Sequence, residues 1–177
     1  VADWPTKRRW VDYAFHALEA AGFRLGSAYT LVRGEGHGFQ YRDALWHGAD
    51  LVGIGVSSFG HIGGAHLQNE HGFDPYVERV QRGELPILRA LLPSADERMI
   101  REFVLQMKTG HVSTRYFLEK FGVEPQARFA PTLELHCAQG FLELANGEIR
   151  ATRDGLLRID ALLRDYFLPE PREVRYV

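Results

Sequence analysis

The sequence predicts a mixed α/β fold, α+β overall, in which the edge of a larger sheet or barrel precedes a helical, winged-helix-like module. Apolar residues recur at three- and four-residue spacing in residues 4–21, and β-forming residues alternate in residues 23–32. Later, Asn146-Gly147 separates two short apolar segments that follow a series of helical patterns. A helix-strand unit followed by helices and a hairpin therefore sets the fold class.

In the first half, the helix at residues 4–21 is expected to begin after Asp3, a capping residue, and to end at Gly22. Residues 23–32 are expected to form one strand. The apolar run 51–56 is typical of a strand buried in a parallel sheet. Few strands remain to complete such a sheet, so we expect an upstream portion of the protein to be missing from the chain.

Further along the chain, Asp74-Pro75 predicts the start of a helix that ends at Gly83. Ser94 and Glu97 match a capping box, which begins a strong helix closed by Gly110. Further helices are expected at residues 113–121, 131–139 and 153–166, with a hairpin at residues 141–151. We place a domain boundary near Pro93, between residues 1–93 and 94–177.

Composition and charge exclude several classes of protein. The net charge is −2 and the pI is near 6.5, which argues against nucleic acid as the main partner. No apolar run approaches the roughly 20 residues that cross a bilayer, and no secretory signal is visible, so we expect a cytoplasmic protein without a membrane partner. Cys137 is the only cysteine, so this chain alone builds neither a disulfide nor an iron-sulfur site.

Glycines in residues 53–60 allow a backbone to approach a ligand closely, as in nucleotide sites. A dinucleotide fingerprint requires a helix immediately afterwards, and residues 61–64 are a poor helix start. The alternative is a tight strand exit that needs glycine for its backbone angles.

Three further patterns each allow a functional and a structural interpretation. The histidines could form a metal or heme site, but their five-residue spacing favours scattered loop residues; they are His37, His47, His61, His66 and His71. The three tryptophans could stack on a flat macrocycle or belong to a core; they are Trp4, Trp10 and Trp46. The segment 131–139, which would be a recognition helix, has no Lys or Arg and contains Glu134, which favours a packing role over DNA binding.

Several blocks, taken in order, resemble the oxygen-independent coproporphyrinogen III oxidase family of radical S-adenosylmethionine enzymes. The blocks are residues 34–46, 53–60, 68–69, 97–102 and 120–123. The resemblance spans most of the chain and implies the last units of a partial (β/α) barrel followed by the helical carboxyl-terminal domain.

The resemblance also implies a three-cysteine motif upstream that binds a 4Fe-4S cluster and S-adenosylmethionine. That motif is absent here, so the cluster ligands are not in this chain and the fragment alone is expected to be inactive. Family members apply the deoxyadenosyl radical to tetrapyrroles or other substrates, and the best-known reaction is the oxidative decarboxylation of coproporphyrinogen III propionates. The implied partners are a tetrapyrrole substrate and the upstream radical S-adenosylmethionine portion.

By the same resemblance, the cofactor-binding residues are expected to be Phe39, Gln40, Gly55, Ser57 and Phe59. Gln40 both donates and accepts hydrogen bonds, and the two phenylalanines offer flat apolar surface. The alternative is that these phenylalanines belong to a barrel core. No residue is a convincing acid, base or nucleophile, so the catalytic residues stay unassigned and no metal ligand is expected.

Residues 41–46 depart from the H-N-x-x-Y-W motif of heme chaperones in this superfamily, because only the tryptophan is retained at Trp46. This weakens a heme-chaperone function, although Tyr41 belongs to a residue type that can ligate heme. The alternatives to the oxidase are therefore a heme-binding or heme-chaperone protein and a radical methyltransferase acting on heme.

Overall fold

A computed structural model describes residues 1–34 and 38–168, which belong to two compact units. One unit comprises residues 1–40 and 99–177, and the other comprises residues 41–98. The helices are α1 (Trp4–Ala20), α2 (Gln40–Trp46), α3 (Phe73–Gln81), α4 (Ala95–Met107), α5 (Thr114–Phe121), α6 (Pro125–Arg128), α7 (Ala130–Ala138), α8 (Arg153–Leu156), α9 (Ile159–Leu162) and the 3-10 helix η1 (Leu163–Tyr166). The strands are β1 (Phe23–Ser27), β2 (Thr30–Arg33), β3 (Phe59–Ile62), β4 (Ala65–Asn69), β5 (Ile87–Leu91), β6 (His111–Ser113), β7 (Leu142–Ala145) and β8 (Glu148–Ala151).

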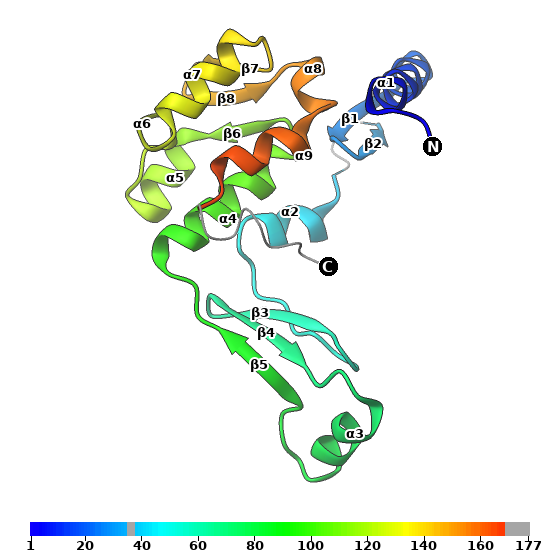
Figure 1. Ribbon diagram of the computed structural model, residues 1–177, viewed down its shortest axis with the longest axis vertical. Coiled ribbons are helices and arrows are strands. Elements are labelled where there is room, and N and C mark those ends of the chain that lie inside the picture. The colour runs from blue at the N-terminus through cyan, green and yellow to red at the C-terminus, as the bar shows by residue number, and fades with distance from the viewer. Residues whose placement is uncertain (35–37, 169–177) are drawn as a thin grey trace. The chain divides into compact units, whose positions relative to one another are not determined.

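The module after residue 98 has the order of a winged helix, in which helices pack on a small sheet (Figure 1). Its strands pair antiparallel in the order β6-β8-β7, with Val112 opposite Ile149 and Leu144 opposite the same residue. The predicted winged-helix-like module is confirmed. The sequence analysis missed the short strand β6 and the one-turn helix α6, which carry too few residues for a periodic pattern.

The core of this module is aromatic and centres on α4. Phe103 is fully buried, and its ring centroid lies 4.6 Å from that of Phe129 and 5.1 Å from that of Tyr166. Phe117 of α5 meets Phe103 edge-on at 5.9 Å. The buried apolar face of α4 also belongs to this core; it consists of Met99, Ile100, Val104 and Met107. Burial of this stripe stabilises the module chiefly through the hydrophobic effect.

The predicted turns and caps of the module are confirmed. Ser94 N–H donates to Glu97 Oε2 at 2.6 Å and Glu97 N–H donates to Ser94 Oγ at 3.2 Å, which is a capping box. Asn146 and Gly147 both have positive φ, at 53° and 74°, as a type I′ hairpin turn requires.

The predicted single helix at residues 153–166 is wrong, because the segment is broken into α8, α9 and η1. The break follows α8, where Arg158 leaves the helical conformation with φ of −117°. Inside α8, a Cβ at Gly155 would lie 1.9 Å from the carbonyl oxygen of Phe141. The chain approaches the hairpin so closely at this residue that only glycine fits.

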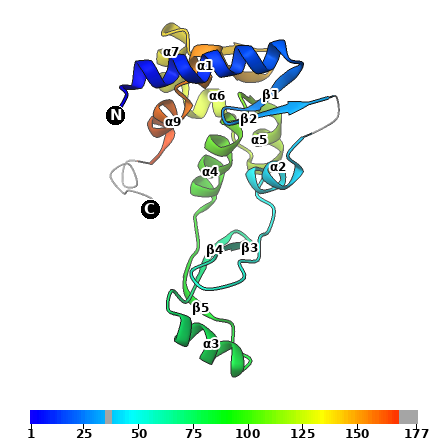
Figure 2. The ribbon, with the colours of Figure 1, turned by 90° about the vertical axis from the view of Figure 1, so that its right-hand side faces the viewer.

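At the start of the chain, α1 confirms the predicted helix, and Thr6 N–H donates to the Asp3 cap at 2.9 Å. The expected single strand at residues 23–32 is wrong, since β1 and β2 form an antiparallel hairpin (Figure 2). Its turn is closed by a 2.8 Å hydrogen bond between the hydroxyls of Ser27 and Thr30. Alternation alone does not reveal a turn that lacks Gly or Asn at its tip.

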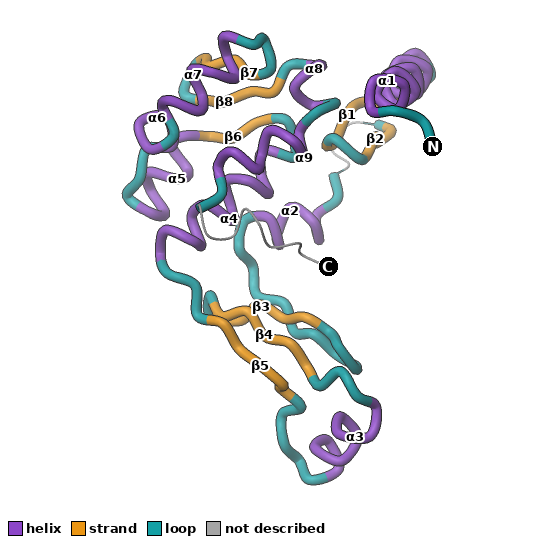
Figure 3. Tube along the Cα trace, viewed as in Figure 1, coloured by secondary structure: helices purple, strands orange, loops and turns teal. Residues whose placement is uncertain are grey.

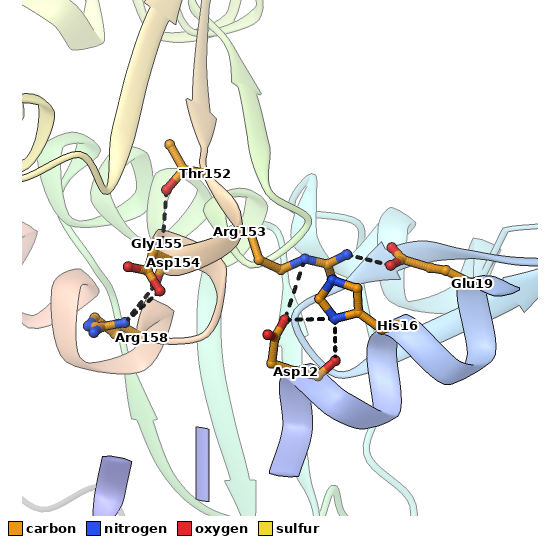
Figure 4. A network of polar contacts seen from close by, with 8 residues as sticks. All are labelled: Asp12, His16, Glu19, Thr152, Arg153, Asp154, Gly155 and Arg158. Atoms are coloured by element: carbon orange, nitrogen blue, oxygen red, sulfur yellow. Dashed lines mark hydrogen bonds and ion pairs between the residues drawn. The ribbon is translucent and has the colours of Figure 1, made fainter. Parts of the chain in front are cut away.

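Arg153 of α8 joins α1 to the winged-helix module (Figure 4). Its guanidinium forms ion pairs with Glu19 and, at 3.8 Å, with Asp12, both on α1. The same group lies 5.3 Å from the ring of Phe15, the buried apolar residue of α1. We call these contacts the α1 clamp; Glu19 and Arg153 within it are 134 positions apart.

The unit of residues 41–98 contains the antiparallel sheet β3-β4-β5 and the helix α3 (Figure 3). The expectation of a buried parallel strand at residues 51–56 is wrong. Only Leu51 pairs, in an isolated antiparallel bridge with His61, and Ile54 is 83% exposed. The helix expected from Asp74-Pro75 is confirmed as α3, which ends before Gly83.

Candidate functional site

The glycine-rich segment of residues 53–58 forms a tight turn that leads into β3. A Cβ at Gly53 would lie 2.4 Å from the carbonyl oxygen of Phe59, so no other residue fits there. Gly55 adopts φ of 102°, a conformation that residues with a side chain rarely adopt. The turn therefore needs both glycines, as the strand-exit interpretation requires, and no helix follows it, so the dinucleotide fingerprint is excluded.

Ser57 has φ of 60° although it is not a glycine, and its side chain is exposed. Its N–H donates to Glu70 O at 2.8 Å, which holds the backbone in this unusual state. Such conformations cost of order 1–3 kcal/mol and gather at binding sites, where surrounding contacts enforce them. Ser57 is thus the predicted site residue with the most distinctive backbone.

The side chain of Asn69 stabilises the turn. This buried amide donates to Gly53 O at 2.9 Å and to Gly55 O at 3.0 Å. Gly55 N–H in turn donates to the hydroxyl of Tyr76 on α3 at 3.1 Å. Sequence reasoning assigned no such role to Asn69 or Tyr76, because the pairing requires residues brought together by the sheet and by α3.

A charged pair supports the other side of the turn. Glu70 is buried, and its Oε1 lies 3.2 Å from Nε of Arg79. The same guanidinium donates to Ile87 O at 2.9 Å, so it ties α3 to β5. Together these contacts make a rigid base for an exposed turn.

The predicted site residues fall in both units. Phe59 follows the turn directly and is 60% exposed at the start of β3, together with Gly55 and Ser57 in the unit of residues 41–98. Phe39 is 52% exposed and precedes Gln40, the exposed first residue of α2, and both belong to the unit that contains α1. Neither phenylalanine belongs to a core formed by the described residues, because both are exposed.

The histidines do not form a metal centre among the described residues, where no group of three or more potential ligands is close enough. His61 and His66 are cross-strand neighbours with ring centroids 4.7 Å apart. His47 donates from Nδ1 to Asp43 O at 2.6 Å in α2. His37 lies outside the described residues.

The residues of this chain do not fit an iron-sulfur cluster. Cys137, the single cysteine, lies on α7, and burial raises the pKa of its thiol, with a further contribution from Glu143. A raised pKa disfavours the thiolate that such clusters need, and one thiolate does not replace three.

The winged-helix module contains two polar clusters that sequence reasoning missed. Buried Glu102 accepts from Tyr116 Oη at 2.5 Å and from Lys120 Nζ at 2.8 Å. Buried His136 lies 3.0 Å from both Tyr166 Oη and Asp165 Oδ2, beside a hollow of about 280 Å³ lined in part by Asp165 and Tyr166. Because the partners are 14 to 30 positions apart, no local motif announces either cluster.

In the described part of the chain, no helix combines the length and the apolar character that membrane crossing requires.

Comparisons with known proteins support the resemblance to oxygen-independent coproporphyrinogen III oxidases. Residues 94–158 match the family model described as the HemN C-terminal domain. The chain is 33% identical over 138 residues to an oxygen-independent coproporphyrinogen III oxidase of Pseudomonas aeruginosa, covering 73% of this chain and 30% of that protein. A protein of the same name from Helicobacter pylori is 31% identical over 84 residues, covering 47% of this chain and 18% of its own length.

Among solved structures, coproporphyrinogen III oxidase (HemN) from Escherichia coli, described as a radical SAM enzyme, superposes with a TM-score of 0.68 at 17% identity. The match covers 88% of this chain and 39% of that protein, and it shows the fold. The predicted mixed α/β class is thereby confirmed. The chain spans less than a third of the length of the curated relatives that it matches.

Proposed function

Because this chain is the carboxyl-terminal portion of a HemN-like protein, we propose that it forms the substrate-facing part of a radical S-adenosylmethionine oxidoreductase acting on a tetrapyrrole. The observation that carries the proposal is the exposed turn of residues 53–58, whose strained Ser57 leads into the exposed Phe59. A rigid turn that presents both backbone and aromatic surface suits a pocket wall for a flat ligand.

The 4Fe-4S cluster belongs, in this proposal, to an upstream portion of the polypeptide. Cys137 is the only thiol here, so the chain alone is inactive. When bound, the cluster and S-adenosylmethionine supply the radical chemistry. The residues of this chain bind and orient, and we assign cofactor contact to Phe39, Gln40, Gly55, Ser57 and Phe59.

The same proposal places a domain boundary near Pro93, between residues 1–93 and 94–177. The start of the HemN C-terminal domain match at residue 94 supports it. The helix α7, at the place of a recognition helix, carries no Lys or Arg, which supports a packing role without nucleic acid. We propose a cytoplasmic enzyme without a membrane partner.

The test uses the native polypeptide that contains this chain, with its cluster reconstituted under anaerobic conditions. We expect coproporphyrinogen III to be consumed only when S-adenosylmethionine is present, and chromatography measures this consumption. Phe59→Ala should lower the rate at least about tenfold if the ring orients a reacting ligand. Phe73→Ala is the matched control, because Phe73 is also exposed, at 71%, in the same unit.

Two results would contradict the proposal. Unchanged turnover in Phe59→Ala would remove this turn from the pocket. Absence of S-adenosylmethionine-dependent consumption of both coproporphyrinogen III and heme would remove the tetrapyrrole substrate.

A second candidate is a heme-binding or heme-delivery protein, and a related one is a methyltransferase acting on heme. The neighbouring rings of His61 and His66 favour heme, because imidazole is a common heme ligand. Adding heme to the chain and recording the Soret band tests this function. An unchanged spectrum at micromolar protein, or the same spectrum in His61→Ala and His66→Ala variants, would exclude these ligands.

A further inference from the structure

One face of the sheet β3-β4-β5 gathers aromatic, amide, imidazole and guanidinium groups. Strand register places two cross-strand rows on it, because directly paired residues in an antiparallel sheet share a face. The first row is Phe59, Gln68 and Arg89, and the second is His61, His66 and Leu91. The contact between the rings of His61 and His66 agrees with this register. We call this surface the β3-β5 face.

Arg89 is held in place on this face by its neighbour in the row. Its Nε donates to Gln68 Oε1 at 2.6 Å, and the arginine side chain is otherwise exposed. Since Nε is engaged, the two terminal nitrogens of the guanidinium form the edge that remains for a ligand. Two parallel N–H groups at this edge match the two oxygens of a carboxylate.

The charge of the β3-β5 face favours an anion. The three strands contain no Asp or Glu. Glu70, which follows β4, is already paired with Arg79. A ligand carboxylate at Arg89 therefore meets no acidic side chain from these strands, and its charge is complemented by the guanidinium.

The shape of the face favours a flat ligand. Three strands spaced about 4.8 Å apart give a row roughly 10 Å wide, comparable with a macrocycle. Phe59 and Leu91 are each 60% exposed at its edges, so apolar surface accompanies the charged group. The row also begins at Phe59, directly after the turn of residues 53–58.

We propose that Arg89, positioned by Gln68, binds a carboxylate side chain of the tetrapyrrole and so selects substrates that carry free propionates. This inference rests on the proposed function and names a specificity-determining residue within it. Gln68 is a positioning residue, because it acts through the guanidinium.

The experiment measures binding of coproporphyrin III, a stable oxidised analogue with four carboxylates, by fluorescence titration of the native polypeptide that contains this chain. Its tetramethyl ester, in the same buffer, is the uncharged probe. We expect the acid to bind about ten- to a hundredfold more tightly than the ester, as charged hydrogen bonds of this kind provide. Arg89→Gln should remove that difference by weakening only the binding of the acid, and Arg89→Lys should keep part of the difference.

Arg82→Gln is the matched control, because Arg82 is an exposed arginine of the same unit that is paired with Glu84 at 2.9 Å. It should bind the acid as the unaltered chain does. Gln68→Leu should weaken binding of the acid less than Arg89→Gln does.

Equal binding of acid and ester, or unchanged binding of the acid by Arg89→Gln, would overturn the inference while leaving porphyrin binding, and hence the proposed function, in place. Binding of neither probe would overturn both. Because Arg89 is exposed, its replacement should leave the far-ultraviolet circular dichroism unchanged, which separates a lost contact from a lost fold.

Discussion

The two compact units are stabilised in different ways. Every buried apolar side chain among the described residues belongs to the unit of residues 1–40 and 99–177, with Phe103 at its centre. In residues 41–98 the buried positions are instead Gly60, His61, Asn69 and Glu70. One unit therefore rests on a hydrophobic core, whereas the other rests on hydrogen bonds, an ion pair and backbone geometry.

Many large apolar side chains of the second unit are exposed on its surface, and none of those that the structure describes is buried. They are Tyr41, Val52, Ile54, Phe59, Ile62, Phe73, Val80, Leu85, Leu88, Leu91 and Leu92. A unit of this size without a core is marginal by itself, and exposed apolar groups are typical of interaction surfaces. The unit that carries the candidate site thus presents apolar surface that a partner or ligand can cover.

The largest effect is expected when a buried and an exposed phenylalanine, one from each unit, are each replaced by alanine. Phe103→Ala should lower the free energy of unfolding by about 4 kcal/mol, because it leaves a cavity among packed rings. Phe59→Ala should change it by less than about 0.5 kcal/mol, since that ring is 60% exposed. Urea denaturation followed by circular dichroism measures both. Similar losses in the two variants would contradict the contrast.

Alkaline pH should first destabilise the unit of residues 1–40 and 99–177, which has the hydrophobic core. Burial raises the pKa of Tyr29, Tyr116 and Tyr166 above the ordinary value of 10.0, with acceptors such as Asp160 and Glu102 adding to the first two. The folded state then holds protons that the unfolded state releases, so stability is complete below about pH 10 and falls as pH rises above it. Each such group contributes a slope of up to about 1.4 kcal/mol per pH unit.

Melting temperatures measured between pH 8 and about pH 11 test this linkage. Tyr116→Phe should flatten the decline, whereas Tyr13→Phe, at an exposed position of α1, should not. A melting temperature that stays constant above pH 10 would exclude the linkage.

An intermediate effect is expected at the turn of the second unit. Asn69→Asp removes the donor to two carbonyls of residues 53 and 55 and should lower local stability by about 2 kcal/mol. Asn146→Asp, at the other asparagine of the chain, keeps a residue that tolerates positive φ and should change little. Amide hydrogen exchange at Ser57 and Asn69 reports the loss; unaltered exchange there would show that the turn is held by other contacts.

The smallest effect concerns the capping of helix α4. Ser94→Ala removes the hydroxyl of the capping box and should cost about 1 kcal/mol. Ser113 begins α5 without a side-chain capping bond, so Ser113→Ala should cost almost nothing from capping. Equal losses in the two variants, measured by urea denaturation, would show that Ser94 does not stabilise α4 through its hydroxyl.

Local signals in the sequence predicted much of the fold. The caps at Asp3 and Ser94 and the hairpin at Asn146-Gly147 depend on neighbouring residues and were all confirmed. Contacts distant in sequence were missed, such as the close approach of Gly155 to the backbone of Phe141. The candidate site follows the same rule: its glycines were visible in the sequence, but its supporting Asn69 and Tyr76 were not.

The α1 clamp has a consequence for biosynthesis. Glu19 pairs with Arg153, which is synthesised 134 residues later. At about 5–20 residues per second, a ribosome takes roughly 7–27 seconds to synthesise the intervening residues. During that interval residues 41–98 have already emerged, apolar surface included. A nascent chain of this kind therefore has a long window in which a chaperone can bind before the first helix gains its final partner.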